Sequence, residues 1–289
     1  MTTIQRSEGN GEGKRVRANG IDIHYVEAGQ GEPLLLLHGG AVSTNPIWKG
    51  HPFAYVPHMG ALAERFRVIA PDARGCGRTT HSGGSITFAQ LADDAVALIE
   101  ALGLDRPSIC GFSEGGITAT LVGIRNPGSI RAIVNDAGYD MFNPMSPSFA
   151  MMRNVFGGSP QATQTDLAAV ERFFGSSPEM QMTLDLIKAD QDAGQGPDYW
   201  KTYLTLAFDR TTQSPGTTFE DLRKVSAPML VLTGDRDEFC TVEEGVTAYR
   251  MLKDGELAVL PGVGHVITPQ KIQMTIDFLR RRGGAKASG

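Results

Sequence analysis

The chain has 289 residues, of which 41% are hydrophobic and 20% are charged. These values are typical of a soluble globular protein with one core and room for an inserted subdomain, and they exclude a disordered or fibrous chain. The formal net charge of −5 leaves no excess of Lys and Arg to neutralise a phosphate backbone, so we expect no nucleic-acid partner.

The sequence contains no apolar run of transmembrane length. Residues 1–13 are polar and glycine-rich, without the apolar segment of a secretion signal. We therefore expect a cytoplasmic protein that does not bind membranes. The three cysteines, Cys76, Cys110 and Cys240, form an odd set without metal-ligand spacing, which argues against a disulfide framework. Cys110 lies in an apolar run, where we expect a small buried side chain.

Short apolar runs, each followed by Gly, Asp or Pro, predict a series of strands. The first segment alternates in polarity, and the later runs are typical of buried parallel strands. The predicted strands are 21–26, 33–37, 67–70, 107–110, 132–134, 228–233 and 257–260. Helical patterns at 87–102 and 117–125, and a basic helix end at 280–282, lie between or after them. This order predicts an α/β fold, with a mostly parallel sheet that helices cover on both faces and ligand chemistry at the carboxyl ends of the strands.

The alternation of strands and helices stops between residues 138 and 220, which we interpret as an inserted helical cap. The core would then comprise residues 14–137 and 221–283. Six methionines fall in the predicted cap: Met141, Met145, Met151, Met152, Met180 and Met182. Flexible, polarizable methionines would let the cap adapt to an apolar ligand, but ordinary packing against the core explains the same residues. The sequence leaves both interpretations open.

One motif carries the first candidate for chemistry. The segment Gly111-Phe112-Ser113-Glu114-Gly115 fits G-x-S-x-G and lies between a predicted strand and a predicted helix. A sharp strand-to-helix turn strains the backbone of the nucleophile and brings neighbouring elements so close that both flanking positions need glycine. Ser113 would project above the sheet, and the amide of Glu114 at the helix N-terminus would face an oxyanion.

A serine hydroxyl needs a base within hydrogen-bond reach and an acid that fixes the tautomer of that base. His265 follows the predicted strand 257–260, and Asp237 follows the predicted strand 228–233. The chain order Ser, Asp, His is the order found in α/β-hydrolases. Asp235 lies two residues before Asp237, and Asp136 follows another predicted strand, so both are alternatives for the acid.

Several segments together resemble the capped α/β-hydrolase family from about residue 21 to residue 282. They are His38-Gly39-Gly40, residues 71–77, residues 111–115 around Ser113 (the serine elbow), residues 234–237 and Gly264-His265. The resemblance implies that the second oxyanion amide belongs to Gly40, with Ala41 as the neighbouring alternative. We expect His38 to shape this loop and Asp72 and Arg74 to hold the next turn.

No cofactor is implied, and His24, His51, His58 and His81 lack the paired spacing of metal ligands, so we expect no metal.

A serine nucleophile separates this chain from the dehalogenase and epoxide-hydrolase branches, which use a carboxylate. We therefore expect hydrolysis of a carboxylic ester or lactone of a small, largely apolar molecule through an acyl-enzyme. The branch that cleaves carbon-carbon bonds in ring-fission dienoates has similar length, motif spacing and cap. It commonly carries Met after the nucleophile and Trp after the histidine, where this chain has Glu114 and Val266. A ligand-binding protein on the same fold is the alternative outside enzymes.

Glu114 places a carboxylate next to the nucleophile, where its charge would disfavour an oxyanion unless it points away or is neutralised. Two roles follow. Glu114 either binds a cationic group of the substrate or pairs with a nearby arginine or hydroxyl. The identity of the substrate and the formation of a homo-oligomer stay open.

Overall fold

The computed structural model describes residues 13–282. Residues 1–12 of the polar N-terminal segment and residue 283 of the predicted core lie outside this range. An eight-stranded sheet forms the centre of the fold, in the order β1-β2-β4-β3-β5-β6-β7-β8. The strands are β1 (Lys14–Ala18), β2 (Ile21–Ala28), β3 (Pro33–Leu37), β4 (Arg67–Pro71), β5 (Ser108–Phe112), β6 (Ile133–Asp136), β7 (Met229–Gly234) and β8 (Gly255–Leu260).

Six of the strands, from β4 to β8 in space, pair in parallel, while β1 and β2 form an antiparallel edge. The predicted mostly parallel sheet is therefore confirmed, and the predicted strands differ from the observed ones by a few residues at their ends. β1 was missed by the sequence analysis. Only Val16 and Ala18 of this strand are buried, and charged residues alternate with them, so it lacks the apolar run that marks the central strands.

Helices cover both faces of the sheet, as the sequence predicts. α2 (Phe88–Ala101), α3 (Glu114–Arg125) and α8 (Val242–Met251) pack on one face, and α1 (Met59–Ala63) and α9 (Pro269–Arg282) lie on the other. Thr87 caps the first of these helices by accepting a hydrogen bond from the amide of Gln90. α3 begins at Glu114, three residues before the predicted start, because two glycines of low helix propensity hide its first turn from a pattern search.

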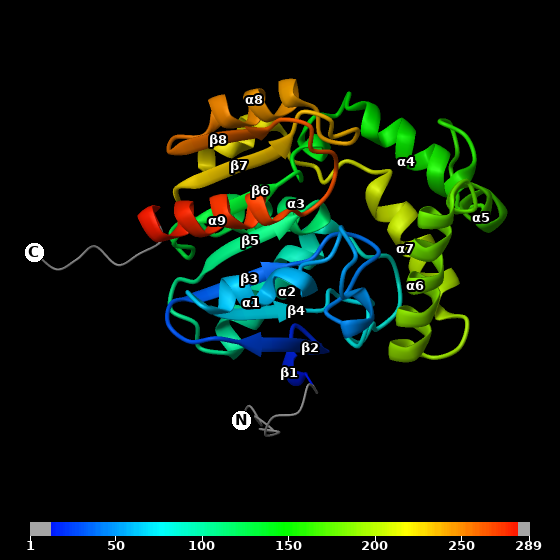
Figure 1. Ribbon diagram of the computed structural model, residues 1–289, viewed down its shortest axis with the longest axis horizontal. Helices are drawn as coiled ribbons and strands as arrows, with labels where there is room; N and C mark the ends of the chain where they lie inside the picture. Colours follow the sequence, from blue (N-terminus) through cyan, green and yellow to red (C-terminus); the bar gives the residue numbers. More distant parts are fainter. Residues whose placement is uncertain (1–12, 283–289) are drawn as a thin grey trace, which may run out of the picture.

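Four helices lie between β6 and β7 in the chain. They are α4 (Pro147–Gly157), α5 (Leu167–Phe174), α6 (Pro178–Gln195) and α7 (Tyr199–Thr211). We call them the helical insertion. The arrowheads of the parallel strands point toward it in Figure 1, so it stands beside the carboxyl ends of these strands. Since side chains at these ends converge, the insertion lies next to the place where the sequence predicts ligand chemistry.

A second hydrophobic cluster attaches the helical insertion to the core. It combines Val42, Trp48 and Cys76 from loops of the core with apolar residues of the insertion, among them Trp200 and Leu204. Met151 and Met180 pack against this cluster, whereas Met145 and Met182 are exposed. Ordinary packing therefore accounts for only part of the methionine content of the segment.

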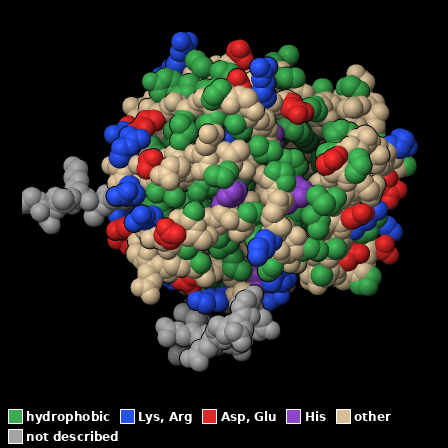
Figure 2. All heavy atoms as spheres, viewed as in Figure 1, with side chains coloured by type: hydrophobic (Ala, Val, Ile, Leu, Met, Phe, Trp, Pro, Cys, Tyr) green, Lys and Arg blue, Asp and Glu red, His purple; other side chains and the backbone are tan. Residues whose placement is uncertain are grey.

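On the face shown in Figure 2, Lys and Arg side chains lie in several small groups interspersed with acidic side chains. This face therefore presents no continuous basic patch of the kind that binds a phosphate backbone. Within residues 13–282, none of the helices combines the length and the apolar character that a membrane crossing requires.

Candidate active site

Ser113 stands at a sharp turn between β5 and α3. Its backbone has φ 53° and ψ −119°, a region that a residue with a Cβ rarely adopts. The flanking glycines allow the neighbouring backbone segments to approach closely at this turn. A Cβ on Gly111 would lie 2.1 Å from the carbonyl oxygen of Gly115, and a Cβ on Gly115 would lie 2.2 Å from the carbonyl oxygen of Leu37. Both contacts agree with the predicted need for glycine.

The structure brings the three predicted triad residues together. The distance from His265 Nε2 to Ser113 Oγ is 3.1 Å, and His265 Nδ1 lies 3.0 Å from each carboxylate oxygen of Asp237. A carboxylate only accepts hydrogen bonds, so the proton of a neutral imidazole belongs on Nδ1 and leaves Nε2 to accept from the serine hydroxyl. The rings of Phe112 and Phe239 flank His265, with centroid distances of 4.8 and 4.6 Å.

Asp237 is held as a carboxylate by its hydrogen bonds. Its side chain is fully buried and also accepts hydrogen bonds from the amides of Phe239 and Cys240. Burial is the largest influence and by itself raises the pKa of Asp237, but the interactions with His265 and the two amides outweigh it, so the pKa lies below its ordinary value. An ionised Asp237 can therefore orient the imidazole throughout the neutral range.

The two alternative acids have other partners. Asp235 accepts a hydrogen bond from the amide of Gly262 at 2.6 Å. Asp136 pairs with the Nζ of Lys271 at 2.6 Å, and both side chains are buried. Burial raises the pKa of Asp136 to about 6, although the charge of Lys271 opposes this shift. Among the three candidates, Asp237 is the one that hydrogen-bonds His265 within the described part of the chain.

The loop after β3 lies against the elbow. His38 accepts a hydrogen bond from the amide of Ala73 at Nε2 and donates to the carbonyl of Gly39 through Nδ1, which fits the predicted shaping role. A Cβ on Gly40 would lie 2.7 Å from Oε1 of Glu114. The amide of Ala41 donates to the hydroxyl of Tyr203 at 2.7 Å.

The amides of Gly40 and Glu114 have no hydrogen-bond acceptor among residues 13–282. Ala41 was the alternative to Gly40, and its amide is already engaged by Tyr203. This leaves Gly40 and Glu114 as the candidate pair of oxyanion donors.

Glu114 pairs with an arginine, which is one of the two roles that the sequence suggests. Its carboxylate accepts three hydrogen bonds from Arg210 of α7, at 2.8, 3.0 and 3.1 Å. The Arg210 side chain is 4% exposed, so the pair is nearly dry. Burial acts most strongly and lowers the pKa of Arg210, but the charge of Glu114 reverses the shift and raises the pKa above its ordinary value. The charge that would oppose an oxyanion is thus neutralised.

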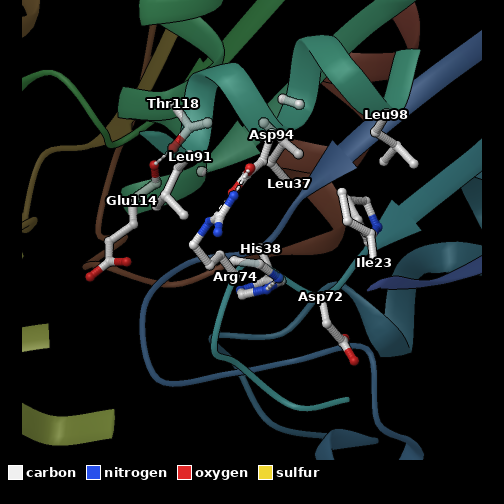
Figure 3. Close-up of a pocket in the computed structure, with 14 residues that line it drawn as sticks. Ile23, Leu37, His38, Asp72, Arg74, Leu91, Asp94, Leu98, Glu114 and Thr118 are labelled. Carbon is white, nitrogen blue, oxygen red and sulfur yellow. Dashed lines mark hydrogen bonds and ion pairs between the residues drawn. The ribbon is translucent and has the colours of Figure 1, made fainter. Parts of the chain in front are cut away.

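Asp72 and Arg74 organise the loops behind the elbow. Asp72 accepts hydrogen bonds from Thr44 and from the amide of Arg78. Burial raises the pKa of Asp72 most strongly, but His24, Thr44 and the amide lower it to about 2 overall. Arg74 instead pairs with Asp94 of α2. Figure 3 shows this pair beside a small cavity of about 50 Å³, with the carboxylate of Glu114 pointing away from it.

Sequence reasoning missed Tyr203 and Arg210. Both lie in the segment predicted as cap, far along the chain from their partners Ala41 and Glu114. The available signal was a tyrosine and an arginine seven residues apart, on one face of a helix that also contains the apolar residues Leu204, Leu206 and Phe208. Lys and Arg are almost never fully buried unless they are paired, so a buried arginine in such a helix implies a partner.

Comparison with known proteins gives the family. The model of the alpha/beta hydrolase family matches residues 34–271. The 2-hydroxy-6-oxo-6-phenylhexa-2,4-dienoate hydrolase of Comamonas testosteroni is 26% identical over 276 residues, which cover 90% of this chain and 92% of that protein. The 3-oxoadipate enol-lactonase 2 of Acinetobacter baylyi is 24% identical over 270 residues, which cover 92% and 95%.

Among solved structures, the meta-cleavage product hydrolase of Pseudomonas fluorescens superposes with a TM-score of 0.72 at 19% identity, covering 94% of this chain and 98% of that chain. This likeness concerns the fold alone. The family match spans most of the 289 residues, and the protein therefore belongs to the alpha/beta hydrolase family.

Proposed function

We propose that the protein is a serine hydrolase that cleaves a carboxylic ester or lactone of a small, largely apolar molecule, a carboxylesterase-like activity. The observation that carries the proposal is the hydrogen-bond chain from Ser113 Oγ through His265 to Asp237. Such a chain activates a hydroxyl that is otherwise a poor nucleophile. The partly exposed phenyl ring of Phe239 beside His265 supports an apolar substrate.

In the proposed mechanism, His265 takes the proton of Ser113 as the oxygen attacks the acyl carbon. The amides of Gly40 and Glu114 donate to the oxyanion, and the protonated His265 gives its proton to the leaving alcohol. Water then attacks the acyl-enzyme while His265 removes its proton, and His265 returns this proton to the serine oxygen as the carboxylic acid leaves. Asp237 stays ionised throughout and stabilises the imidazolium.

The second candidate is the hydrolysis of a carbon-carbon bond in a ring-fission dienoate. The 26% identical relative from Comamonas testosteroni is named for such a substrate and supports this candidate. The enol-lactonase relative supports the first candidate. Glu114 and Val266, which replace the Met and Trp common in the carbon-carbon branch, also favour the ester or lactone.

A substrate panel tests the proposal. We expect the wild-type protein to hydrolyse p-nitrophenyl esters of short to medium chain length or simple lactones, with higher kcat/KM than for a ring-fission dienoate. Turnover of the dienoate alone would favour the second candidate. A ligand-binding protein without turnover would instead bind small molecules saturably and leave a fluorophosphonate probe unreacted.

A variant at Glu114 tests the proposed pairing role against the cation-binding role. Since Arg210 already neutralises this carboxylate, we expect Glu114→Gln to lower kcat/KM by the same factor on an amino ester and on a neutral ester of equal size. It should also cost about 3 kcal/mol of unfolding free energy, the lower end for a broken buried pair because glutamine keeps a hydrogen-bond acceptor. A loss confined to the amino ester would support cation binding.

We further propose that the helical insertion serves as the cap predicted for residues 138–220, between the two core segments. The cytoplasmic location and the oligomeric state stay predictions from the sequence.

A further inference from the structure

One helix of the insertion contacts both halves of the proposed oxyanion hole. Tyr203 and Arg210 lie on α7, about two turns apart, which places them on the same face of the helix. Both are buried, at 3% and 6% exposure. Tyr203 contacts the loop after β3, and Arg210 contacts the first residue of α3. A single rigid element therefore spans the two segments that carry the candidate donors.

The contact of Tyr203 stabilises an unfavourable backbone conformation. Ala41, whose amide donates to the Tyr203 hydroxyl at 2.7 Å, has φ 68°, in the left-handed region that alanine rarely adopts. Such a residue keeps this conformation only where its surroundings hold it. Because Ala41 follows Gly40 directly, a change in its backbone would turn the peptide group between the two residues, and the Gly40 amide, one peptide group earlier, would lose its fixed position. The tyrosine hydroxyl thus fixes one candidate donor through its neighbour.

The contact of Arg210 fixes the other donor. Its guanidinium forms a forked set of hydrogen bonds with Glu114, whose own amide is the second candidate donor. The carboxylate of Glu114 also occupies the space that a side chain on Gly40 would need. The carboxylate thus packs against Gly40, and the ion pair keeps its negative charge from turning toward an oxyanion.

A third polar contact secures the same loop to the insertion. Asp190 of α6 accepts hydrogen bonds from Trp48 Nε1 at 2.7 Å and from Asn45 Nδ2 at 2.9 Å. Asp190 and Trp48 are both buried. The loop after β3 is thus bonded to two helices of the insertion, so an outward swing of these helices would break buried hydrogen bonds at several points.

We infer that Tyr203 and Arg210 are positioning residues that hold the two donors of the oxyanion hole, so that the helical insertion is part of the catalytic architecture. The inference rests on the proposed function for its effect on rate. If the insertion were a lid that only admits substrate, changes on α7 would alter KM more than kcat. Loss of a positioning contact should instead lower kcat.

The variant Tyr203→Phe tests this inference, with Tyr199→Phe as its matched control. Tyr199 lies one turn earlier on α7, and its hydroxyl donates to the carbonyl of Gly75 at 3.1 Å, away from the oxyanion loop. Each variant loses one hydrogen bond from the same helix, so both should lower Tm by a few degrees. A purely structural role of Tyr203 would give both variants the same kinetics at 25 °C.

We expect Tyr203→Phe to lower kcat on a p-nitrophenyl ester about tenfold with little change in KM, because a displaced donor weakens only the transition state. Its affinity for phenylboronic acid, which forms a tetrahedral adduct with an active serine, should fall by a similar factor. Tyr199→Phe should leave both values at the wild-type level. Equal kcat and equal boronate affinity in Tyr203→Phe and wild type would overturn the inference.

Two further measurements keep the inference testable. Hydrogen-deuterium exchange of the peptide spanning residues 39–45 should quicken in Tyr203→Phe and not in Tyr199→Phe, and this readout needs no activity. If wild type neither hydrolyses esters nor binds the boronate, the proposed function fails. Unchanged exchange in Tyr203→Phe would separately refute the positioning role.

The double variant Glu114→Gln/Arg210→Met tests the role of Arg210. It leaves no unpaired charge, so it should fold and show lowered kcat. A wild-type kcat in this variant would refute the role of Arg210.

Discussion

Replacing Ser113 by alanine is expected to lower kcat by a factor of about 10⁶, as removal of the nucleophile does in serine hydrolases with an intact triad. The loss is this large because no acyl-enzyme can form without the serine hydroxyl, to which His265 Nε2 is hydrogen-bonded. Alanine keeps the Cβ and the backbone of the elbow, so the fold and the binding of substrate should persist. Steady-state hydrolysis of the best ester from the substrate panel measures the effect.

The control for this variant is Ser129→Ala. Ser129 is exposed, and its hydroxyl donates to the carbonyl of Asn126, at the end of α3 opposite to the elbow. It should retain wild-type kcat, and it should still react with a fluorophosphonate probe, whereas Ser113→Ala should not. Hydrolysis by Ser113→Ala at a rate near that of wild type would show that another group is the nucleophile.

The elbow and the triad could be predicted from the sequence because each depends on a local pattern. The buried parallel strands give continuous apolar runs. A serine with a glycine two residues before and two residues after it, following such a run, indicates a tight strand-to-helix turn, because a Cβ at either glycine would clash. The order of Asp237 and His265 after two later strands then places all three residues at the same edge of the sheet. Pattern and topology together therefore sufficed to predict that Ser113 and His265 lie within hydrogen-bond distance.

The sequence favoured Asp237 as the acid but left Asp235 and Asp136 open, since the choice depends on which partners the neighbouring carboxylates find. Asp235 bonds an amide in its own turn, and Asp136 pairs with Lys271 from the last helix. Lys271 lies among the buried residues of α9, where a pattern search expects an apolar side chain. Contacts across more than a hundred residues, such as this pair and the bond from Ala41 to Tyr203, leave no local signature in the sequence.

The buried pair of Lys271 and Asp136 contacts the elbow at Ser113 and Phe112. Their side chains are 1% and 3% exposed, and the backbone carbonyl of Asp136 accepts a hydrogen bond from the amide of Ser113 at 2.8 Å. The Nζ of Lys271 also lies 5.7 Å from the ring centroid of Phe112. Disturbance of the pair therefore acts on both Phe112 and Ser113 at the turn after β5.

Lys271→Met is expected to cost about 3 to 5 kcal/mol of unfolding free energy at pH 8, because it leaves the carboxylate of Asp136 buried without a countercharge. The expected cost depends on pH in a definite direction. Burial raises the pKa of Asp136 from 3.8 to about 6 in the folded wild type, against the opposing influence of Lys271. Loss of Lys271 removes the largest influence that lowers this pKa, so the pKa should rise further. A raised carboxyl pKa gives stability that is present below 3.8 and is lost as the pH rises through the folded value.

At pH 5 Asp136 binds a proton in both folded proteins for most of the time, so the deficit of Lys271→Met should be small there and should widen toward pH 8. Urea unfolding of both proteins at pH 5 and pH 8 measures it. The double variant Asp136→Asn/Lys271→Met has no charge to bury and should regain most of the lost stability. If it is as unstable as the single variant at both pH values, the lost packing of the lysine stem explains the effect and the ion pair does not.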